Sequence, residues 1–266
     1  MIDFTQILAQ ASYYYGSGSD YYYGAGQSAG AMYSGVTLIG LALVLLAAMV
    51  GGIVQMGLKN AFTRYSEEPA PLTGAETARR MLMQYGLGDV QIISTKGSLT
   101  DHYNPLDRTV NLSESVYNEA SVAAMAVAAH ECGHAVQHAQ AYPWLGLRSS
   151  LVPMVNIGSR LGQVVLMVGL ALLAMGSGTT VAWIGLALYA TTTLFALVTL
   201  PVEFDASRRA LAWLNDSGMA DRAMHGQAGT ALRWAGMTYV AAALSSLAML
   251  LYYALILLSR MSNNRE

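Results

Sequence analysis

Charged residues are scarce in this sequence, and cysteine is almost absent. Lys, Arg, Asp and Glu make up 11% of the 266 residues, whereas 54% are hydrophobic; soluble domains carry about 25% charged residues. The formal net charge of −2 gives no basis for binding nucleic acid, which needs an excess of basic residues. The single cysteine, Cys132, excludes an internal disulfide bond. The composition predicts an integral membrane protein with a modest soluble portion and no nucleic-acid partner.

The N-terminus also lacks the basic segment that precedes the apolar core of a signal peptide, so we predict none. Residues 1–33 are instead rich in Tyr, Gly and Ser and show neither a helical nor a strand period. We expect a flexible tail there. The alternative is an aromatic segment that lies at the bilayer surface or against another subunit.

Four apolar stretches are long enough to cross a bilayer, which requires about 20 residues each. They lie at 36–58, 153–175, 180–200 and 237–258. The expected segments are a tail (1–33), a first span (34–58), a soluble part (59–146), two further spans (147–200), a helix with a connector (201–236), a fourth span (237–259) and a second tail (260–266).

The distribution of Lys and Arg predicts the orientation of these spans. The segments 59–150 and 201–236 contain most of the basic residues, and the N-terminal tail and the loop near Gly176 contain none. With four spans, both basic segments face the same side, and the rule makes that side the cytoplasm. Arg260 and Arg265 argue mildly against this orientation.

The soluble part has clear local signals. Thr73 and Glu76 form a capping box, and the helix that follows carries apolar residues at helical spacing. Short strands are predicted at 90–94 and 109–112, with a polar loop between them. A long Ala-rich stretch then predicts a helix that ends near Gln140, before Pro143. A new helix is expected to begin at Pro201, and a short polar helix to precede the fourth span.

The Ala-rich helix carries the motif His130-Glu131-Cys132-Gly133-His134. Histidines four residues apart stand on one helix face, so two imidazoles can bind one zinc ion. The intervening glutamate can take a proton from a zinc-bound water and pass it to a leaving amine, which is the chemistry of amide hydrolysis. The alternative is a buried helix whose histidines only form hydrogen bonds. We interpret Cys132 as an apolar spacer rather than a thiol that acts at the metal.

A catalytic zinc normally has three protein ligands, so a third is needed. His138 lies one further turn along the helix, about 6 Å beyond His134, which is too far to bind the same ion. A histidine six residues after His134 would be an alternative, but Gln140 occupies that position. Glu203 is the better candidate, since it follows a span and is expected on the same side of the membrane. From position alone, a glutamate that only interacts with a helix dipole remains equally acceptable.

Three segments resemble a known family, the bacterial YugP-type neutral zinc metallopeptidases: HECGHAVQH at 130–138, DHYNP at 101–105 and LPVEFDAS at 200–207. The resemblance leaves out residues 1–33. More distantly, the layout is similar to HtpX and the CAAX prenyl proteases, where two spans separate the His-Glu-x-x-His helix from a Glu-x-x-x-Asp helix.

The resemblance implies that His130, His134 and Glu203 bind zinc and that Glu131 is the general base. The fourth position after Glu203 is Ser207 rather than Asp. Asp205 and Ser207 are therefore both candidates for orienting a ligand. His102, His225, Arg208 and Tyr239 are weaker candidates for stabilising an oxyanion.

The implied protein is mainly α and integral to the bacterial plasma membrane, with about four transmembrane helices and a small α+β, gluzincin-like zinc peptidase domain whose sheet has two or slightly more strands. It would be a zinc metalloendopeptidase that hydrolyses membrane-associated or misfolded polypeptides on the cytoplasmic side, with a zinc-bound water activated by Glu131. Its partners would be the polypeptide substrate, the lipid bilayer and a second copy or another membrane protein. The alternative function is a non-catalytic membrane scaffold with a structural metal site.

Peptidases with this motif commonly hold the substrate as an added strand at a sheet edge. The segment 110–112 is the candidate edge, and a simple hairpin is the alternative.

Overall fold

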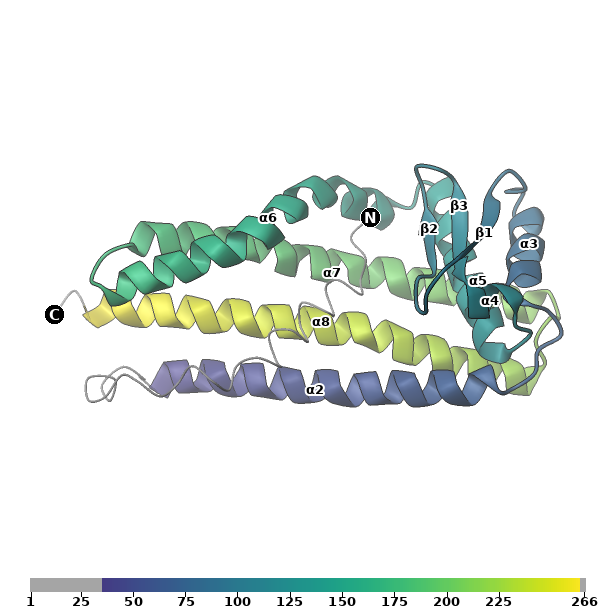
Figure 1. The fold of residues 1–266 in the computed structure, drawn as a ribbon, viewed down its shortest axis with the longest axis horizontal. Coiled ribbons are helices and arrows are strands. Elements are labelled where there is room, and N and C mark those ends of the chain that lie inside the picture. Colours follow the sequence, from purple (N-terminus) through teal and green to yellow (C-terminus); the bar gives the residue numbers. More distant parts are fainter. Residues whose placement is uncertain (1–34, 264–266) are drawn as a thin grey trace. The chain divides into compact units, whose positions relative to one another are not determined.

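The computed structural model describes residues 35–263 (Figure 1). The predicted N-terminal tail and residues 264–266 of the second tail lie outside the described part. The chain divides into two compact units. The sheet unit contains residues 49–150 and 196–243, and the helical unit contains the other described residues.

Four long helices in the described part have the length and composition of membrane spans, as the sequence predicts. They are α2 (Gly35–Ser66), α6 (Pro143–Ala174), α7 (Thr179–Asp216) and α8 (Arg222–Asn263). At about 1.5 Å per residue, α7 with its 38 residues is longer than the hydrocarbon core of a bilayer, about 30 Å thick. The chain is therefore a mainly α integral membrane protein whose spanning helices continue beyond their apolar runs.

The helix boundaries predicted at Pro201 and near Met237 are wrong. Helix α7 continues through Pro201, although proline removes a backbone donor, and α8 is a single helix. The apolar face of α7 explains the first error, because buried residues recur at intervals of four on both sides of that point: Val198, Val202, Ala206, Ala210 and Leu214. Packing of this face outweighs the cost of the proline.

Within the helical unit, α6 and α7 approach each other at glycines. A Cβ atom at Gly169 would lie 2.4 Å from the Cα atom of Ala182, and one at Gly185 would lie 2.3 Å from the amide nitrogen of Leu166. Small residues at a helix contact let two backbones approach closely, which is a typical way of packing helices in a membrane.

In the sheet unit, two predicted helices form, the first of them with its predicted cap. Helix α3 (Gly74–Gln84) begins with the capping box: the Thr73 hydroxyl accepts from the amide of Glu76, and the amide of Thr73 donates to the Glu76 carboxylate. Helix α5 (Val122–Ala139) begins after Ser121, whose hydroxyl accepts from the amide of Ala124 at 3.2 Å. Its C-cap is Gln140, as expected.

Both predicted strands form, and a third makes the sheet slightly larger than two strands, as expected, but the pairing differs from the prediction. Its strands are β1 (Gln91–Thr95), β2 (His102–Asn104) and β3 (Thr109–Ser113), in the order β1-β3-β2. The strands β1 and β3 pair in parallel, so they form no hairpin, and β2 lies antiparallel to β3. The segment 110–112 is therefore not an edge: it belongs to the central strand, all five residues of which are buried. The edge strand next to α5 is instead β2, which lies within the predicted polar loop (Figure 1).

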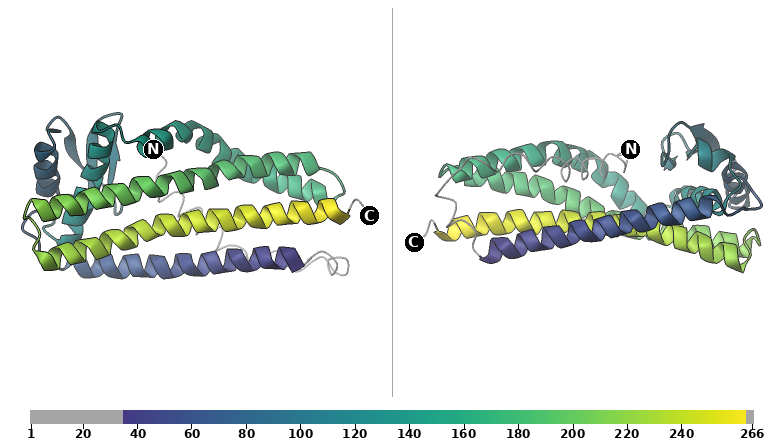
Figure 2. Two further views of the ribbon diagram at one scale, coloured as in Figure 1. Left: turned by 180° about the vertical axis from the view of Figure 1, so that it is seen from behind. Right: turned by 60° about the horizontal axis from the view of Figure 1, so that its bottom comes forward.

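The first helix after the sheet is the short α4 (Glu114–Asn118), and it leads directly into α5. The parts of α7 and α8 in the sheet unit lie side by side in both views of Figure 2. There the ring of His225 on α8 contacts the carbonyl oxygen of Leu211 on α7, with Nε2 at 3.2 Å. The motif helix α5 and the Glu203 segment of α7 thus belong to one unit.

Candidate metal centre

The His-Glu-x-x-His motif lies in the middle of α5, on a buried part of the helix. The imidazoles of His130 and His134 stack edge to face, with ring centroids 4.8 Å apart. Gly133 lies between them and faces α7, where an added Cβ atom would be 2.6 Å from the carbonyl oxygen of Ala206. The absence of a side chain at this position therefore allows α5 to approach α7 closely.

Glu203 extends from α7 toward both histidines. Its Oε2 atom lies 3.3 Å from Nε2 of His130 and 3.5 Å from Nε2 of His134, and the side chain is 2% exposed. One ligand atom from each of these residues lies within 4.8 Å of the others. The sequence interpretation brought these three residues together across about seventy positions of chain, and they do converge.

These donors fit a zinc ion. Two imidazole nitrogens and a carboxylate oxygen are typical zinc ligands, with bonds of about 2.0–2.2 Å, so neighbouring ligands of a tetrahedral ion lie about 3.3 Å apart. The distances from the glutamate oxygen to the two nitrogens agree with this spacing. In addition, Oε2 of Glu203 is buried without a hydrogen-bond partner. A buried charged oxygen is costly unless something binds it, and a cation at this point would do so.

The other nitrogen of His134 is held by Gln137. The Nδ1–H group donates to Oε1 of Gln137 at 3.0 Å when Nε2 is directed to the metal. The amide nitrogen of Gln137 donates in turn to the carbonyl oxygen of Val202 at 2.8 Å and to Oδ2 of Asp205 at 2.9 Å. Gln137 is fully buried. It links the motif helix to α7 and fixes the orientation of His134.

The equivalent partner of His130 is Ser207. Its hydroxyl lies 3.1 Å from Nδ1 of His130, where it can accept the ring proton. The serine at the position where the resembled pattern has Asp therefore contacts a histidine directly. Asp205 acts through Gln137 and pairs with Arg208 and Arg209. Ser207 therefore supports His130 directly, and Asp205 supports His134 through Gln137.

The second carboxylate oxygen of Glu203 has partners of its own. Oε1 lies 3.5 Å from a guanidinium nitrogen of Arg148, at the start of α6. The Tyr239 side chain of α8 also hydrogen-bonds to the Glu203 side chain. Arg148 and Gln137 were missed by the sequence analysis. Gln137 follows His134 by three residues, a spacing that places both on one helix face, so it could have been noticed; Arg148 carried no such signal.

Glu131 lies between the ligands and β2. Burial raises the pKa of its carboxyl group to about 7. The nearby His130 lowers this pKa, and the like charge of Glu203 raises it further. The backbone of Tyr103 on β2 hydrogen-bonds to this carboxylate. A carboxyl group with a pKa near neutrality is suited to take up and release a proton.

The remaining sequence candidates have other partners. Nδ1 of His138 lies 2.8 Å from the hydroxyl of Tyr103, and His138 is outside the group of residues that could hold a metal ion. Nδ1 of His102 contacts the carbonyl oxygen of Thr100 at 2.8 Å, and His225 contacts α7. Cys132 is buried next to the carbonyl oxygen of Ala78, which agrees with its role as a spacer.

The fold and this centre define a class: an integral membrane protein that can hold a metal ion between a motif helix and the extension of a spanning helix. The chain belongs to the family described as "Putative neutral zinc metallopeptidase", which matches residues 40–258. It is 41% identical over 212 residues to the "Putative membrane protease YugP" of Bacillus subtilis (strain 168), covering 79% of this chain and 92% of that protein. No solved structure matches the chain. Membership of this family and the His130, His134 and Glu203 group agree on zinc as the cofactor.

The close approach at Gly133 gives a first prediction. We expect Gly133→Ala to destabilise the protein by about 1–3 kcal/mol, because the added methyl group would meet the backbone of α7. It should also lower the zinc content, since the same contact positions Glu203. Thermal unfolding in detergent and metal analysis measure both effects.

The matched control is Gly146→Ala, where an added Cβ atom would have no neighbour within 4 Å. This variant should keep the stability and zinc content of the wild type. If Gly133→Ala and Gly146→Ala had the same stability and zinc content, the close contact of α5 with α7 at Gly133 would not be needed for either property.

Ser207 gives a second prediction. Ser207→Ala removes the hydroxyl that contacts His130 and should weaken zinc binding about 10- to 100-fold, as loss of a group behind a ligand commonly does. Competition with a chelator of known affinity measures this change. Ser150→Ala, at an exposed hydroxyl on α6, is the control. An unchanged dissociation constant for zinc in Ser207→Ala would show that the contact has no effect on the ligand.

Proposed function

We propose that this protein is an integral-membrane zinc metalloendopeptidase of the gluzincin kind. His130, His134 and Glu203 bind the zinc ion, and Glu131 is the general base. The observation that carries the proposal is the convergence of two Nε2 atoms on a buried carboxylate oxygen without a hydrogen-bond partner. The motif glutamate beside this point supplies the group that hydrolysis requires.

The chain's own residues perform the proton transfers. When bound, zinc lowers the pKa of a water molecule toward about 7 and polarises the peptide carbonyl group. Glu131 accepts the proton of the attacking water and then donates it to the leaving amine. Gln137 and Ser207 hold the two imidazoles in the orientation that directs Nε2 to the metal. Arg148 and Tyr239 hold Glu203, so that one oxygen remains directed at the histidines.

The substrate would pair with β2. This strand is an edge of the sheet and lies next to α5, and the backbone of Tyr103 in its middle contacts Glu131. An extended polypeptide added to this edge would therefore pass the catalytic carboxylate. Because the ligand helix α7 is itself a spanning helix, we propose membrane-associated or misfolded polypeptides as the substrates. The distribution of basic residues favours the cytoplasmic side for the site.

The test uses the purified full-length protein in detergent, with zinc measured per chain and an unfolded protein such as casein as substrate. We expect about one zinc ion per chain, cleavage of casein, loss of cleavage after chelation and recovery when zinc is returned. A chain that holds stoichiometric zinc but cleaves no unfolded or membrane-associated substrate would favour the structural metal site of a scaffold instead.

A further inference from the structure

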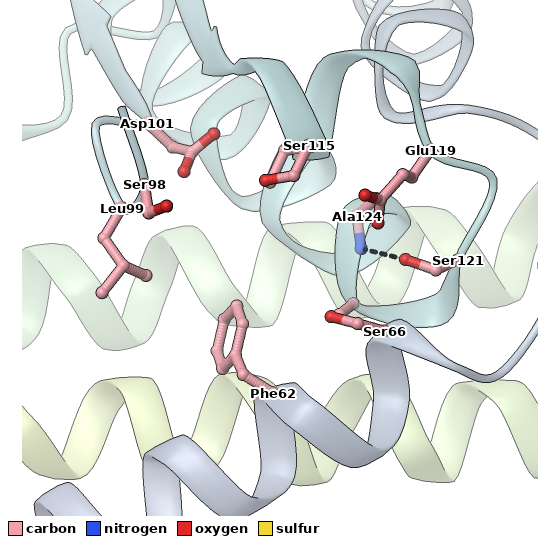
Figure 3. A pocket seen from close by; sticks show the side chains of 11 residues that line it. Phe62, Ser66, Ser98, Leu99, Asp101, Ser115, Glu119, Ser121 and Ala124 are labelled. Atoms are coloured by element: carbon pink, nitrogen blue, oxygen red, sulfur yellow. Dashed lines mark hydrogen bonds between the residues drawn. The ribbon is translucent and has the colours of Figure 1, made fainter. Parts of the chain in front are cut away.

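A cavity of about 160 Å³ lies in the sheet unit, and none of the residues of the metal centre line it (Figure 3). A cavity of about this size accepts a group as large as benzene. Its walls come from the end of α2, the loop before β2, the helix α4 and the first turn of α5. The side chains that matter here are Phe62, Leu99, Asp101, Val116 and Glu119.

The cavity and the catalytic carboxylate share one face of α5. Ala124 lines the cavity, and Ala128 and Glu131 follow it at intervals of four and three, which keeps all three on the same side of the helix. Seven residues of helix span about 10 Å. Asp101, which lines the cavity, directly precedes β2, the strand whose Tyr103 backbone contacts Glu131. An extended polypeptide advances about 3.3 Å per residue and covers this distance in about three residues.

The lining has acidic and apolar parts but no basic side chain. Asp101 lies at one side and is held in place by Ser113, whose amide donates to Oδ1 at 2.7 Å and whose hydroxyl contacts both carboxylate oxygens at 3.1 Å. Burial raises the pKa of Asp101, so an incoming cation would replace some of the lost solvation. The exposed carboxylate of Glu119 lies at the other side (Figure 3).

The apolar part suits the stem of a long side chain. Phe62, Leu99 and Val116 line the cavity together with the two acidic groups. Lysine and arginine lay their methylene groups along apolar surface while their charged ends reach polar groups. A short side chain would leave the apolar wall uncovered, and an acidic side chain would be repelled by the two carboxylates.

We propose that this cavity is a specificity pocket for a lysine or arginine side chain of the substrate, about three residues from the peptide bond that is cut. This inference rests on the proposed peptidase function and names its substrate class: polypeptide segments with a basic residue close to the cleavage point. Such residues are abundant beside the cytoplasmic ends of membrane spans. Phe62 and Ser66, which line the cavity, lie at the C-terminal end of α2, a helix with the length and composition of a span.

The experiment measures kcat/KM of the full-length zinc protein on a set of peptides that differ by one Lys, Leu or Glu, moved along the sequence. We expect about tenfold faster cleavage when Lys lies three positions from the cut bond than with Leu there, the size of effect of a charge-assisted contact. The double variant Asp101→Asn/Glu119→Gln should lose this preference, and Glu119→Lys should favour Glu instead. Glu114→Gln, at the start of the short helix that ends just before Glu119 but outside the lining, should keep it.

A second measurement separates this proposal from the peptidase function. Binding of the Lys and Leu peptides to the Glu131→Gln variant is followed by fluorescence anisotropy, which needs no turnover. Tighter binding of the Lys peptide, lost in the cavity double variant, supports the pocket even if the wild type cleaves nothing. Cleavage at equal rates for all peptides, or a preference that persists in the double variant, overturns the pocket and leaves the peptidase function standing.

Discussion

Replacing Glu131 by glutamine should lower the rate of peptide hydrolysis about 10²- to 10⁴-fold, the usual contribution of a positioned general base. Glutamine has the same shape and occupies the same space between β2 and the histidines, but it accepts no proton. The ligands His130, His134 and Glu203 remain, so zinc binding should persist at about one ion per chain. The measurement is kcat on an unfolded protein substrate, together with metal analysis of the same preparation.

The comparison variant for Glu131→Gln is Glu114→Gln, at an exposed position on α4. It changes the net charge by the same amount and should cleave at the wild-type rate. Wild-type cleavage by a zinc-loaded Glu131→Gln protein would remove Glu131 from the reaction. Loss of zinc from that variant would instead show that the glutamate supports the ligands rather than the proton transfer.

Replacing Glu203 by alanine should weaken zinc binding by more than about 100-fold, since even loss of a group behind a ligand commonly costs 10- to 100-fold. The variant keeps only the two imidazoles of α5, and proteolysis should disappear with the metal. Glu203→Gln preserves the size of the side chain next to Arg148 and Tyr239, and it should also bind zinc weakly because it lacks the carboxylate charge. Zinc dissociation constants from chelator competition and a circular dichroism spectrum of each variant are the measurements.

His138→Ala is the matched control for this ligand. His138 belongs to the same helix and resembles a third zinc ligand in the sequence, but its Nδ1 atom contacts the Tyr103 hydroxyl. Its removal should leave the zinc content unchanged. If Glu203→Ala held zinc as tightly as the wild type, Glu203 would not be a ligand. If His138→Ala lost its zinc, His138 would become the better candidate for the third ligand.

The sequence by itself determined the parts of this protein that depend on neighbouring residues. The lengths of the apolar runs predicted four spans, the pair Thr73 and Glu76 fixed the start of α3, and the spacing of His130 and His134 placed both on one face of α5. Each of these features rests on a local rule: the thickness of a bilayer, the unpaired amides of a helix start, or the helical repeat. A few consecutive residues suffice to apply such a rule.

Only the tertiary structure decided how distant segments meet. It made β3 the central strand and β2 the edge, because the parallel pairing of β1 with β3 depends on contacts between segments about eighteen residues apart. It carried α7 through Pro201, because the buried face of that helix continues on both sides. It also placed Ser207 against His130 and joined Gln137 to Val202 and Asp205 on α7, which local patterns left open. Hydrogen bonds and packing between chain segments 60 or more positions apart are set by the folded arrangement as a whole, and no local periodicity records them.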